Sequence, residues 1–242
     1  MDLVEEYKNQ YQWRSWERAY NLIPKIAGQT VLDLGCGIGD QAADLIDRGA
    51  KVIGIDLNDE LLNEARSLCP KNAQFIKSDF RNLPDLGEKV DGIWSGFSAA
   101  YLTEFSPVLK SWKEYLKKEG WVAITEIDNF FGHKPLKEDV RSILKDYVDY
   151  AYKKGRYDFK MGRKLEGYLK KSGFDIIETT TLEDLEFSFS GPASEEVLTA
   201  WEKRFDRMVG LKKFCGSRYE SIKNEFLSCL ASEQHRSLCK VF

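Results

Sequence analysis

From Thr30 onward, short apolar runs alternate with longer segments whose apolar residues recur at helical spacing. Such alternation predicts strands joined by helices, and right-handed connections of this length give a parallel sheet that is covered on both faces. We expect strands at 30–35, 51–56, 73–78, 90–95 and 121–126, with helices at 40–49, 58–68, 105–117 and 162–171. Two further strands, at 174–180 and 184–190, are expected to pair antiparallel at the sheet edge. The pattern therefore predicts a doubly wound α/β fold with a seven-stranded, mostly parallel sheet.

Helical patterns also flank and interrupt this alternation. The first segment is unusually aromatic, which fits either a lid over a site or a helix whose aromatic face packs on the core. A helix is expected at 136–154, and two more at 194–209 and 217–231. We predict three parts: an N-terminal helical lid at 1–28, a core at 29–192 with a helical cap inserted at 128–160, and a C-terminal helical extension at 193–242.

Composition narrows the class of protein. The 242 residues are 43% hydrophobic, which suits one domain with additions, and the formal charge of −3 predicts no strong nonspecific attraction to nucleic acid. Five cysteines without a C-x-x-C pair and only two histidines predict neither a disulfide framework nor a metal site. The sequence shows no signal segment and no apolar run of membrane-spanning length. We therefore expect a cytoplasmic protein, monomeric or homodimeric.

A glycine-rich turn carries the strongest functional signal. The first predicted strand runs into Gly35, Gly37 and Gly39, and the second predicted strand ends at Asp56. Glycines let the backbone approach a ligand closely, and an acid at the end of the second strand is placed to accept hydrogen bonds from ribose hydroxyls. The layout predicts a crevice for a nucleotide-type cofactor.

The residues around this turn indicate which cofactor. The spacing departs from the G-x-G-x-x-G of dinucleotide sites, and the turn has acids at Asp33 and Asp40 but no Lys or Arg to meet a phosphate. A pyrophosphate would be repelled there, whereas a cationic sulfonium with an ammonium group would not. The run VLDLGCGIGD resembles motif I of the class I S-adenosylmethionine-dependent methyltransferases.

Further motifs extend the resemblance in the expected order. The third predicted strand ends in Ser-Asp-Phe, where the family uses an acid for the adenine amino group, and the fourth ends at Ser95 and Gly96 beside the methionine part of the cofactor. The resemblance implies S-adenosylmethionine as cofactor. The cofactor-binding residues that it implies are Asp33, Gly35, Cys36, Gly37, Gly39, Asp56, Leu57, Asp79, Phe80, Ser95 and Gly96.

The acceptor side is predicted from the segment after the fifth strand. His133 is a candidate general base because its ordinary pKa is near neutrality, although a solvated loop histidine is an alternative. Glu126 and Asp128 are candidates to bind an acceptor amine or remove a proton. Arg163 closes the substrate pocket in one interpretation and pairs with an acid in another. The candidate substrate-binding residues, which could wall an apolar pocket or stack on a cation, are Tyr11, Trp13, Phe97, Tyr101, Phe130, Tyr157 and Arg163.

These features favour methyl transfer to an oxygen, nitrogen or carbon atom of a small molecule. The fourth strand is followed by Ser95-Gly96-Phe97-Ser98 in place of the Asn/Asp-Pro-Pro-Tyr motif that marks methylation of base or amide nitrogens. Three alternatives stay open: a methyltransferase for tRNA or protein, a noncatalytic subunit that binds the cofactor, and a nicotinamide-dependent oxidoreductase.

Overall fold

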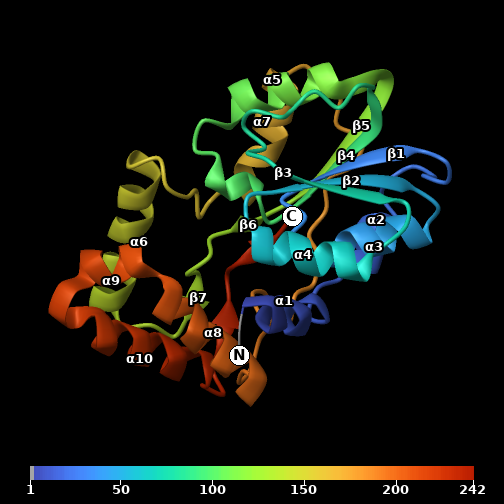
Figure 1. The fold of residues 1–242 in the computed structure, drawn as a ribbon. Helices are drawn as coiled ribbons and strands as arrows, with labels where there is room; N and C mark the ends of the chain where they lie inside the picture. Colours follow the sequence, from blue (N-terminus) through green and yellow to red (C-terminus); the bar gives the residue numbers. More distant parts are fainter. Residues whose placement is uncertain (1–2) are drawn as a thin grey trace.

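The computed structural model describes residues 3–242 as a parallel sheet with helices on both faces and a group of helices beyond one end (Figure 1). The sheet has five parallel strands in the order β3-β2-β1-β4-β5. Their bounds are β1 Thr30–Leu34, β2 Lys51–Asp56, β3 Ala73–Lys77, β4 Val90–Gly96 and β5 Leu116–Thr125. The chain runs outward from β1 to β2 and β3 and then crosses to β4 on the other side of β1. The direction of winding therefore reverses between β1 and β4. Ligands of doubly wound sheets bind at such a switch point, outside the carboxyl ends of the strands.

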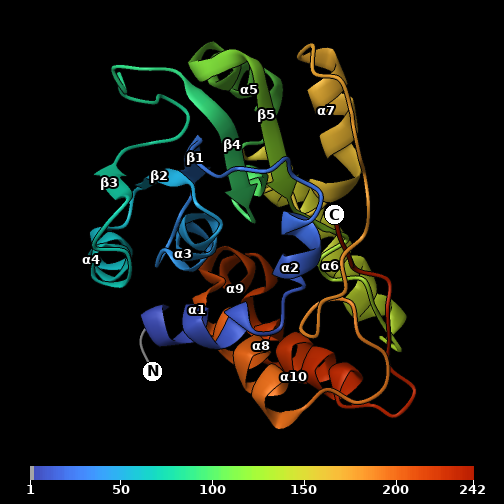
Figure 2. The same cartoon turned by 90° about the vertical axis from the view of Figure 1, so that its right-hand side faces the viewer.

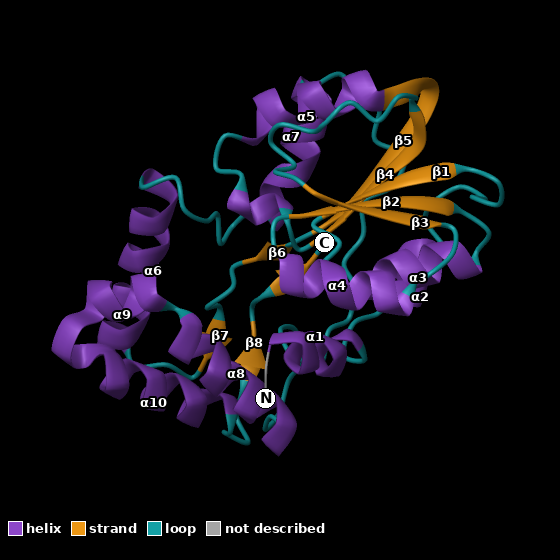
Figure 3. Cartoon of the chain, in the orientation of Figure 1, coloured by secondary structure: helices purple, strands orange, loops and turns teal. Residues whose placement is uncertain are grey.

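Two layers of helices cover the sheet, as Figures 2 and 3 show. The helices of the predicted core are α3 Asp40–Asp47, α4 Asp59–Leu68, α5 Phe105–Tyr115 and α7 Leu165–Lys171. Helices α3 and α4 pack on one face, where Leu45 and Leu62 are fully buried, and α5 and α7 pack on the other. Helix α4 begins at the Asn58 cap, whose side chain accepts hydrogen bonds from the backbone of Glu60 and Leu61.

The remaining helices, with one exception, lie toward the carboxyl end of the sheet (Figure 2). They are α1 Leu3–Tyr11, α2 Trp16–Tyr20, α6 Glu138–Lys153, α8 Glu195–Arg207, α9 Val209–Cys215 and α10 Tyr219–Leu230, with short 3₁₀ turns η1 Ala99–Tyr101, η2 Gly162–Lys164 and η3 Gly216–Arg218. The exception is α2, whose Tyr20 stacks on Trp94 of β4 on the face that α3 covers. Helix α6 packs against α9 and belongs to the same group as α8 and α10 (Figure 1). Among residues 3–242, no helix is long and apolar enough to span a bilayer.

The predicted antiparallel edge pair is not confirmed. Residues 174–180 and 184–190 form no strand ladder within the described chain, and only the isolated bridges of Leu182, Asp184 and Ser190 occur in this region. The chain end instead supplies the antiparallel partners: β9 Lys240–Val241 pairs with β6 Ile127–Asp128, and β8 Arg236–Ser237 pairs with β7 His133–Lys134. Because Asp184 and Glu186 are buried in ion pairs, side-chain contacts hold this segment in place of a ladder.

Candidate functional site

A cavity of about 600 Å³ lies at the carboxyl end of the sheet, which is the size of a small-molecule site. The turns after β1, β2, β3 and β4 form its floor, and α1, α8 and residues 155–157 contribute the opposite wall. The sequence-predicted residues that line it are Tyr11, Gly35, Cys36, Gly37, Asp56, Leu57, Asp79, Phe80, Gly96, Phe97, Tyr101, Phe130 and Tyr157. Side chains from distant parts of the chain thus meet around one cavity.

The turn after β1 has the backbone conformation that its glycines require. Gly35 has a φ of +78°, and a Cβ placed there would lie 1.9 Å from the Ser98 hydroxyl oxygen. The amide of Gly37 donates a hydrogen bond to Asp56 Oδ2 at 3.0 Å. The first two glycines therefore bring the backbone to the cavity, and the second also fixes the acid at the end of β2.

Asp56 is held from both sides at the cavity edge. Its Oδ1 accepts a hydrogen bond from the backbone amide of Asn58 at 2.9 Å, and its Oδ2 accepts the one from Gly37. A carboxylate oxygen has two lone pairs, so both oxygens can accept a further hydrogen bond from a ligand in the cavity. This geometry suits a pair of neighbouring hydroxyls.

Asp33 lies beneath the glycine turn and does not line the cavity. Its Oδ2 is buried and has no hydrogen-bond partner among the described residues. Burial raises the pKa of Asp33 to about 8, and the negative charge of Asp56 adds to this rise. A positive charge above the turn would relieve both effects, so the residues present fit a cationic group there.

Asp79 and Phe80, after β3, also lie at the cavity. Both carboxylate oxygens of Asp79 accept from Arg81 Nε at 2.9 Å. This hydrogen bonding is the largest influence on the pKa of Asp79 and lowers it. The carbonyl of Phe80 accepts a hydrogen bond from Trp112 at 2.8 Å, which anchors this turn to α5. Arg81 lines the cavity as well and was not predicted from the sequence.

Besides Asp33, three further residues predicted in the sheet, its turns and the N-terminal segment lie away from the cavity. Gly39 packs on α4, where an added Cβ would come within 2.9 Å of Ala65 Cβ. Ser95 is completely buried within β4, and the Trp13 side chain is buried in the core. These positions support the fold of the site, whereas their neighbours Gly37, Gly96 and Tyr11 reach the cavity.

The two acidic candidates after β5 are bonded to other groups of the protein. Glu126 is fully buried, and its carboxylate accepts hydrogen bonds from the amides of Ala100 and Ile127 at 2.8 and 3.1 Å. Burial raises the pKa of Glu126 to about 7. Asp128 pairs with Arg163 at 2.5 Å, and none of Glu126, Asp128 and Arg163 lines the cavity. The structure therefore uses them to attach β6 and the following turns, not to contact a ligand.

His133 is not placed where a general base would act. It lies in β7 away from the cavity, with its Nδ1 3.0 Å from His235 Nε2. His235 Nδ1 faces the Gly191 carbonyl and must donate to it, which makes His133 Nδ1 the donor between the two rings. Burial, followed by the influence of His235, lowers the pKa of His133 to about 3. The packing of a β7–β8 pair, which sequence spacing does not reveal, puts this ring in the interior.

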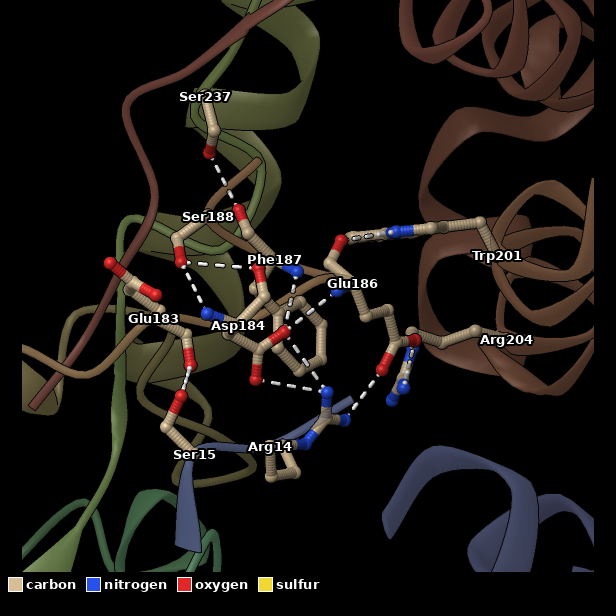
Figure 4. Close-up of polar contacts among 10 residues, drawn as sticks. All are labelled: Arg14, Ser15, Glu183, Asp184, Glu186, Phe187, Ser188, Trp201, Arg204 and Ser237. Carbon is tan, nitrogen blue, oxygen red and sulfur yellow. Dashed lines mark hydrogen bonds and ion pairs between the residues drawn. The ribbon is translucent and has the colours of Figure 1, made fainter. Parts of the chain in front are cut away.

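Several lining residues escaped sequence reasoning because they come from outside the strand ends. Tyr7 of α1 lies over the glycine turn, since a Cβ on Gly37 would be 3.6 Å from its ring. Arg14 and Arg204 line the cavity from the N-terminal segment and α8, beside Phe187 (Figure 4). The aromatic pattern of the first segment was a signal for Tyr7, but nothing local marks the two arginines.

Comparisons with known proteins agree with this geometry. Residues 31–120 match a family model described as a methyltransferase domain. The chain is 28% identical over 201 residues to the methyltransferase GfsG of Streptomyces halstedii, covering 78% of this chain and 66% of that protein. It is 26% identical over 195 residues to a demethylmenaquinone methyltransferase of Lactococcus lactis, covering 76% and 73%.

A solved structure of a methyltransferase from Bacillus halodurans superposes with a TM-score of 0.62 at 16% identity, covering 94% of this chain and 95% of that one. Two further curated relatives are matched over 45% and 48% of their length, so the chain spans about half of those proteins. The structural match concerns the fold, and the sequence matches concern the region that carries the glycine turn and Asp56. Residues 31–120 therefore form a methyltransferase domain, and the chain is similar to methyltransferases over most of its length.

Proposed function

We propose that this protein transfers a methyl group from S-adenosylmethionine to an oxygen, nitrogen or carbon atom of a small molecule. The observation that carries the proposal is that Gly35, Gly37 and Asp56 line the same cavity of about 600 Å³ as a group of aromatic side chains, and we take these two sets of residues as its first and second ends. The first end fits the cofactor of the family, and the second leaves room for an acceptor.

The residues at the first end would each bind a different part of the cofactor. Gly35, Cys36 and Gly37 pass beside the methionine part, and Asp56 accepts from the ribose hydroxyls. Asp79, Phe80 and Leu57 surround the adenine, with Asp79 accepting from the ring amino group. When bound, the cofactor supplies the electrophilic methyl group and its leaving group, so this chain has to orient the acceptor and exclude water.

The second end provides that orientation. Tyr11, Phe97, Tyr101, Phe130 and Tyr157 line it, and Tyr101 and Tyr157 meet edge to face with ring centroids 4.9 Å apart. Tyr101 is 58% exposed, and the ordinary pKa of tyrosine is about 10, so its hydroxyl is protonated and can donate hydrogen bonds at neutral pH. These residues bind the acceptor, and their rings displace water from the reacting centre.

The proposed division into parts is supported by the same cavity. Residues 1–28 act as a lid through Tyr7 and Tyr11, although the first two residues lie outside the described chain. The core spans 29–192, its insertion at 128–160 forms the cap, and residues 193–242 complete the cap from below with α8. A cytoplasmic location and a monomeric or homodimeric state stay predictions, and the five unpaired thiols suit a reducing compartment.

Thermal unfolding with S-adenosylhomocysteine tests the proposal, with NAD as the matched nucleotide control. A ligand at about 100 times its dissociation constant adds ~2.7 kcal/mol of stability, a shift of a few degrees for a chain of this size. We expect a shift with S-adenosylhomocysteine alone. A shift with NAD alone would assign the cavity to a dinucleotide and contradict the proposal.

A further inference from the structure

Two arginines line the wall of the cavity, and both lie near the ring of one phenylalanine. Arg14 follows α1, and Arg204 belongs to the last part of α8. Their guanidinium carbons lie 4.6 and 5.1 Å from the ring centroid of Phe187. Figure 4 shows both side chains beside this residue. Such stacking holds a guanidinium flat against a ring and fixes the direction of its N–H groups.

Two buried carboxylates hold these arginines from behind. Glu186 accepts from Arg14 Nη2 at 2.5 Å through one oxygen and from Arg204 Nε and Nη2 at 3.1 and 2.5 Å through the other. Asp184 accepts from Arg14 Nη1 at 3.0 and 2.9 Å through its two oxygens. Glu186 is fully buried and does not line the cavity, whereas both arginines do. The carboxylates therefore position the guanidiniums and do not themselves meet a ligand.

Arg204 keeps part of its hydrogen-bonding capacity for the cavity. Its bonds to Glu186 leave from Nε and Nη2, and no bond from Nη1 to any of the described residues is found. The positive charge of Arg204 also favours a negative charge at Tyr7. Desolvation raises the pKa of Tyr7, and Arg204 is the strongest of the influences that lower it. A guanidinium donates and never accepts, so the matching ligand group is an oxygen acceptor, best of all a carboxylate.

The aromatic rings beside the arginines do not serve a cationic ligand. Arg14 already lies over Phe97 at 5.2 Å and over Phe187, and Arg204 lies 5.9 Å from the Phe130 ring centroid. An ammonium group in this part of the cavity would compete with the protein's own cations for the ring faces and would be repelled by them. The open ring surface that remains suits a flat, apolar body.

We propose that the acceptor of this enzyme has a flat apolar body and a carboxylate, which the Nη1 group of Arg204 anchors, with Glu186 as the positioning residue. The proposal rests on the proposed function, because it assigns the half of the same cavity that the cofactor leaves free. The anchored carboxylate sets the orientation of the acceptor, and the atom that receives the methyl group lies elsewhere on the acceptor body.

The test compares three probes of equal shape on protein saturated with S-adenosylhomocysteine: 2-naphthoate, 2-naphthamide and 2-(aminomethyl)naphthalene. Calorimetry measures each dissociation constant. We expect naphthoate to bind at least ~10-fold more tightly than the amide, as for a hydrogen bond between two charged groups, and the amine to bind most weakly.

Variants assign this preference to Arg204. Glu186→Gln combined with Arg204→Gln removes one buried charge of each sign, so neither is left unpaired. We expect it to reduce the preference for naphthoate to less than ~3-fold, while Arg204→Lys, which keeps the charge but loses the fork, gives an intermediate value. Arg218→Gln is the matched control, because Arg218 makes an exposed ion pair with Asp139 far from the cavity wall, and it should keep the full preference.

Each outcome is decisive. Four outcomes would overturn the substrate inference alone, provided that S-adenosylhomocysteine still binds. They are equal binding of the three probes, a preference for the amine, no binding of any probe, and a preference for naphthoate that survives the double variant. Failure of S-adenosylhomocysteine to bind the unmodified protein would contradict the proposed function itself, and the substrate inference with it.

Discussion

At the scale of single residues, the site depends on a few backbone positions that hold one carboxylate. Asp56 receives amide hydrogen bonds from Gly37 and Asn58, so its orientation is set before any ligand arrives. Asp33 lies behind it as a buried acid with an unsatisfied oxygen. Preorganised acceptors of this kind bind more tightly than mobile ones, because little ordering entropy is lost on binding.

Replacing Asp56 with Ala removes the acceptors for the ribose hydroxyls. We expect the affinity for S-adenosylhomocysteine to fall by at least ~1.5 kcal/mol, about the value of a hydrogen bond to a charged group. Isothermal titration calorimetry measures the change. Asp59→Ala is the control, because Asp59 pairs with Lys77 at the surface and does not line the cavity. Unchanged affinity in the Asp56 variant would remove this residue from the cofactor site.

Replacing Gly35 with Ala tests the close approach of the turn. The added Cβ would collide with Ser98 at 1.9 Å and would occupy a left-handed backbone position. Gly87→Ala separates the two effects, since Gly87 has a similar φ of +74° but open space around it. We expect urea denaturation to show a loss of about 1 kcal/mol for Gly87→Ala from the backbone alone, and a clearly larger loss for Gly35→Ala. Equal losses would show that Ser98 moves away freely.

At the scale of elements, the chain end decides how the cap is attached to the core. Strands β8 and β9 pair with β7 and β6, which follow directly after β5. The His133–His235 contact joins β7 to the residue before β8 in the protein interior. There Trp201 and Phe226 contact the His133 ring edge to face. A neutral imidazole pair is compatible with this apolar surrounding, whereas a protonated one is not.

The pH dependence of stability follows from this pair. The folded pKa of His133 is about 3 and the ordinary value is 6.5, so only the unfolded chain takes up this proton between these two values. The contribution of His133 is therefore fully present above pH 6.5 and is lost as pH falls below it, by up to ~1.4 kcal/mol per pH unit. We expect His133→Phe to lower the slope of the unfolding free energy against pH by up to ~1.4 kcal/mol per pH unit between pH 6.5 and 4, as measured by urea denaturation. An unchanged slope would place the proton elsewhere.

At the scale of the whole molecule, one cavity collects side chains from both ends of the sequence. Tyr7 and Arg14 reach it from the N-terminal segment, and Gly35 and Asp56 reach it from the sheet. Phe187 comes from the last part of the core, and Arg204 comes from the C-terminal extension. The last residues support this arrangement, because Val241 is 1% exposed and pairs with both Ile127 and Leu182. The stability of the tail and the shape of the cavity are therefore coupled.

Truncating Val241 to Ala tests that coupling. Deleting a fully buried branched side chain leaves a cavity, so we expect a loss of about 2 kcal/mol in urea unfolding. Leu238→Ala provides the comparison within the same tail, because Leu238 is half exposed and should change stability by less than about 0.5 kcal/mol. A small loss at Val241 would show that the tail is dispensable for the fold.

The sequence by itself determined the local parts of the molecule. Buried strands, amphipathic helices, the Asn58 cap and the glycine turn with Asp56 depend on residues that are close in sequence or on consecutive strands, so their periodicity and spacing predict them. The family and its cofactor followed from the same turn. Alternating strands and helices also predicted the parallel sheet, whereas its strand order was known only from the structure.

Only the tertiary structure decided the contacts between distant segments. It placed His133 against His235, paired Asp128 with Arg163, and replaced the expected edge strands with ion pairs and a returning chain end. It also brought Arg14 and Arg204 together beside the Phe187 ring. A buried charge is tolerated only beside its partner, and here each partner lies far away in the sequence. The chemistry of the acceptor half of the cavity is therefore visible only in the folded chain.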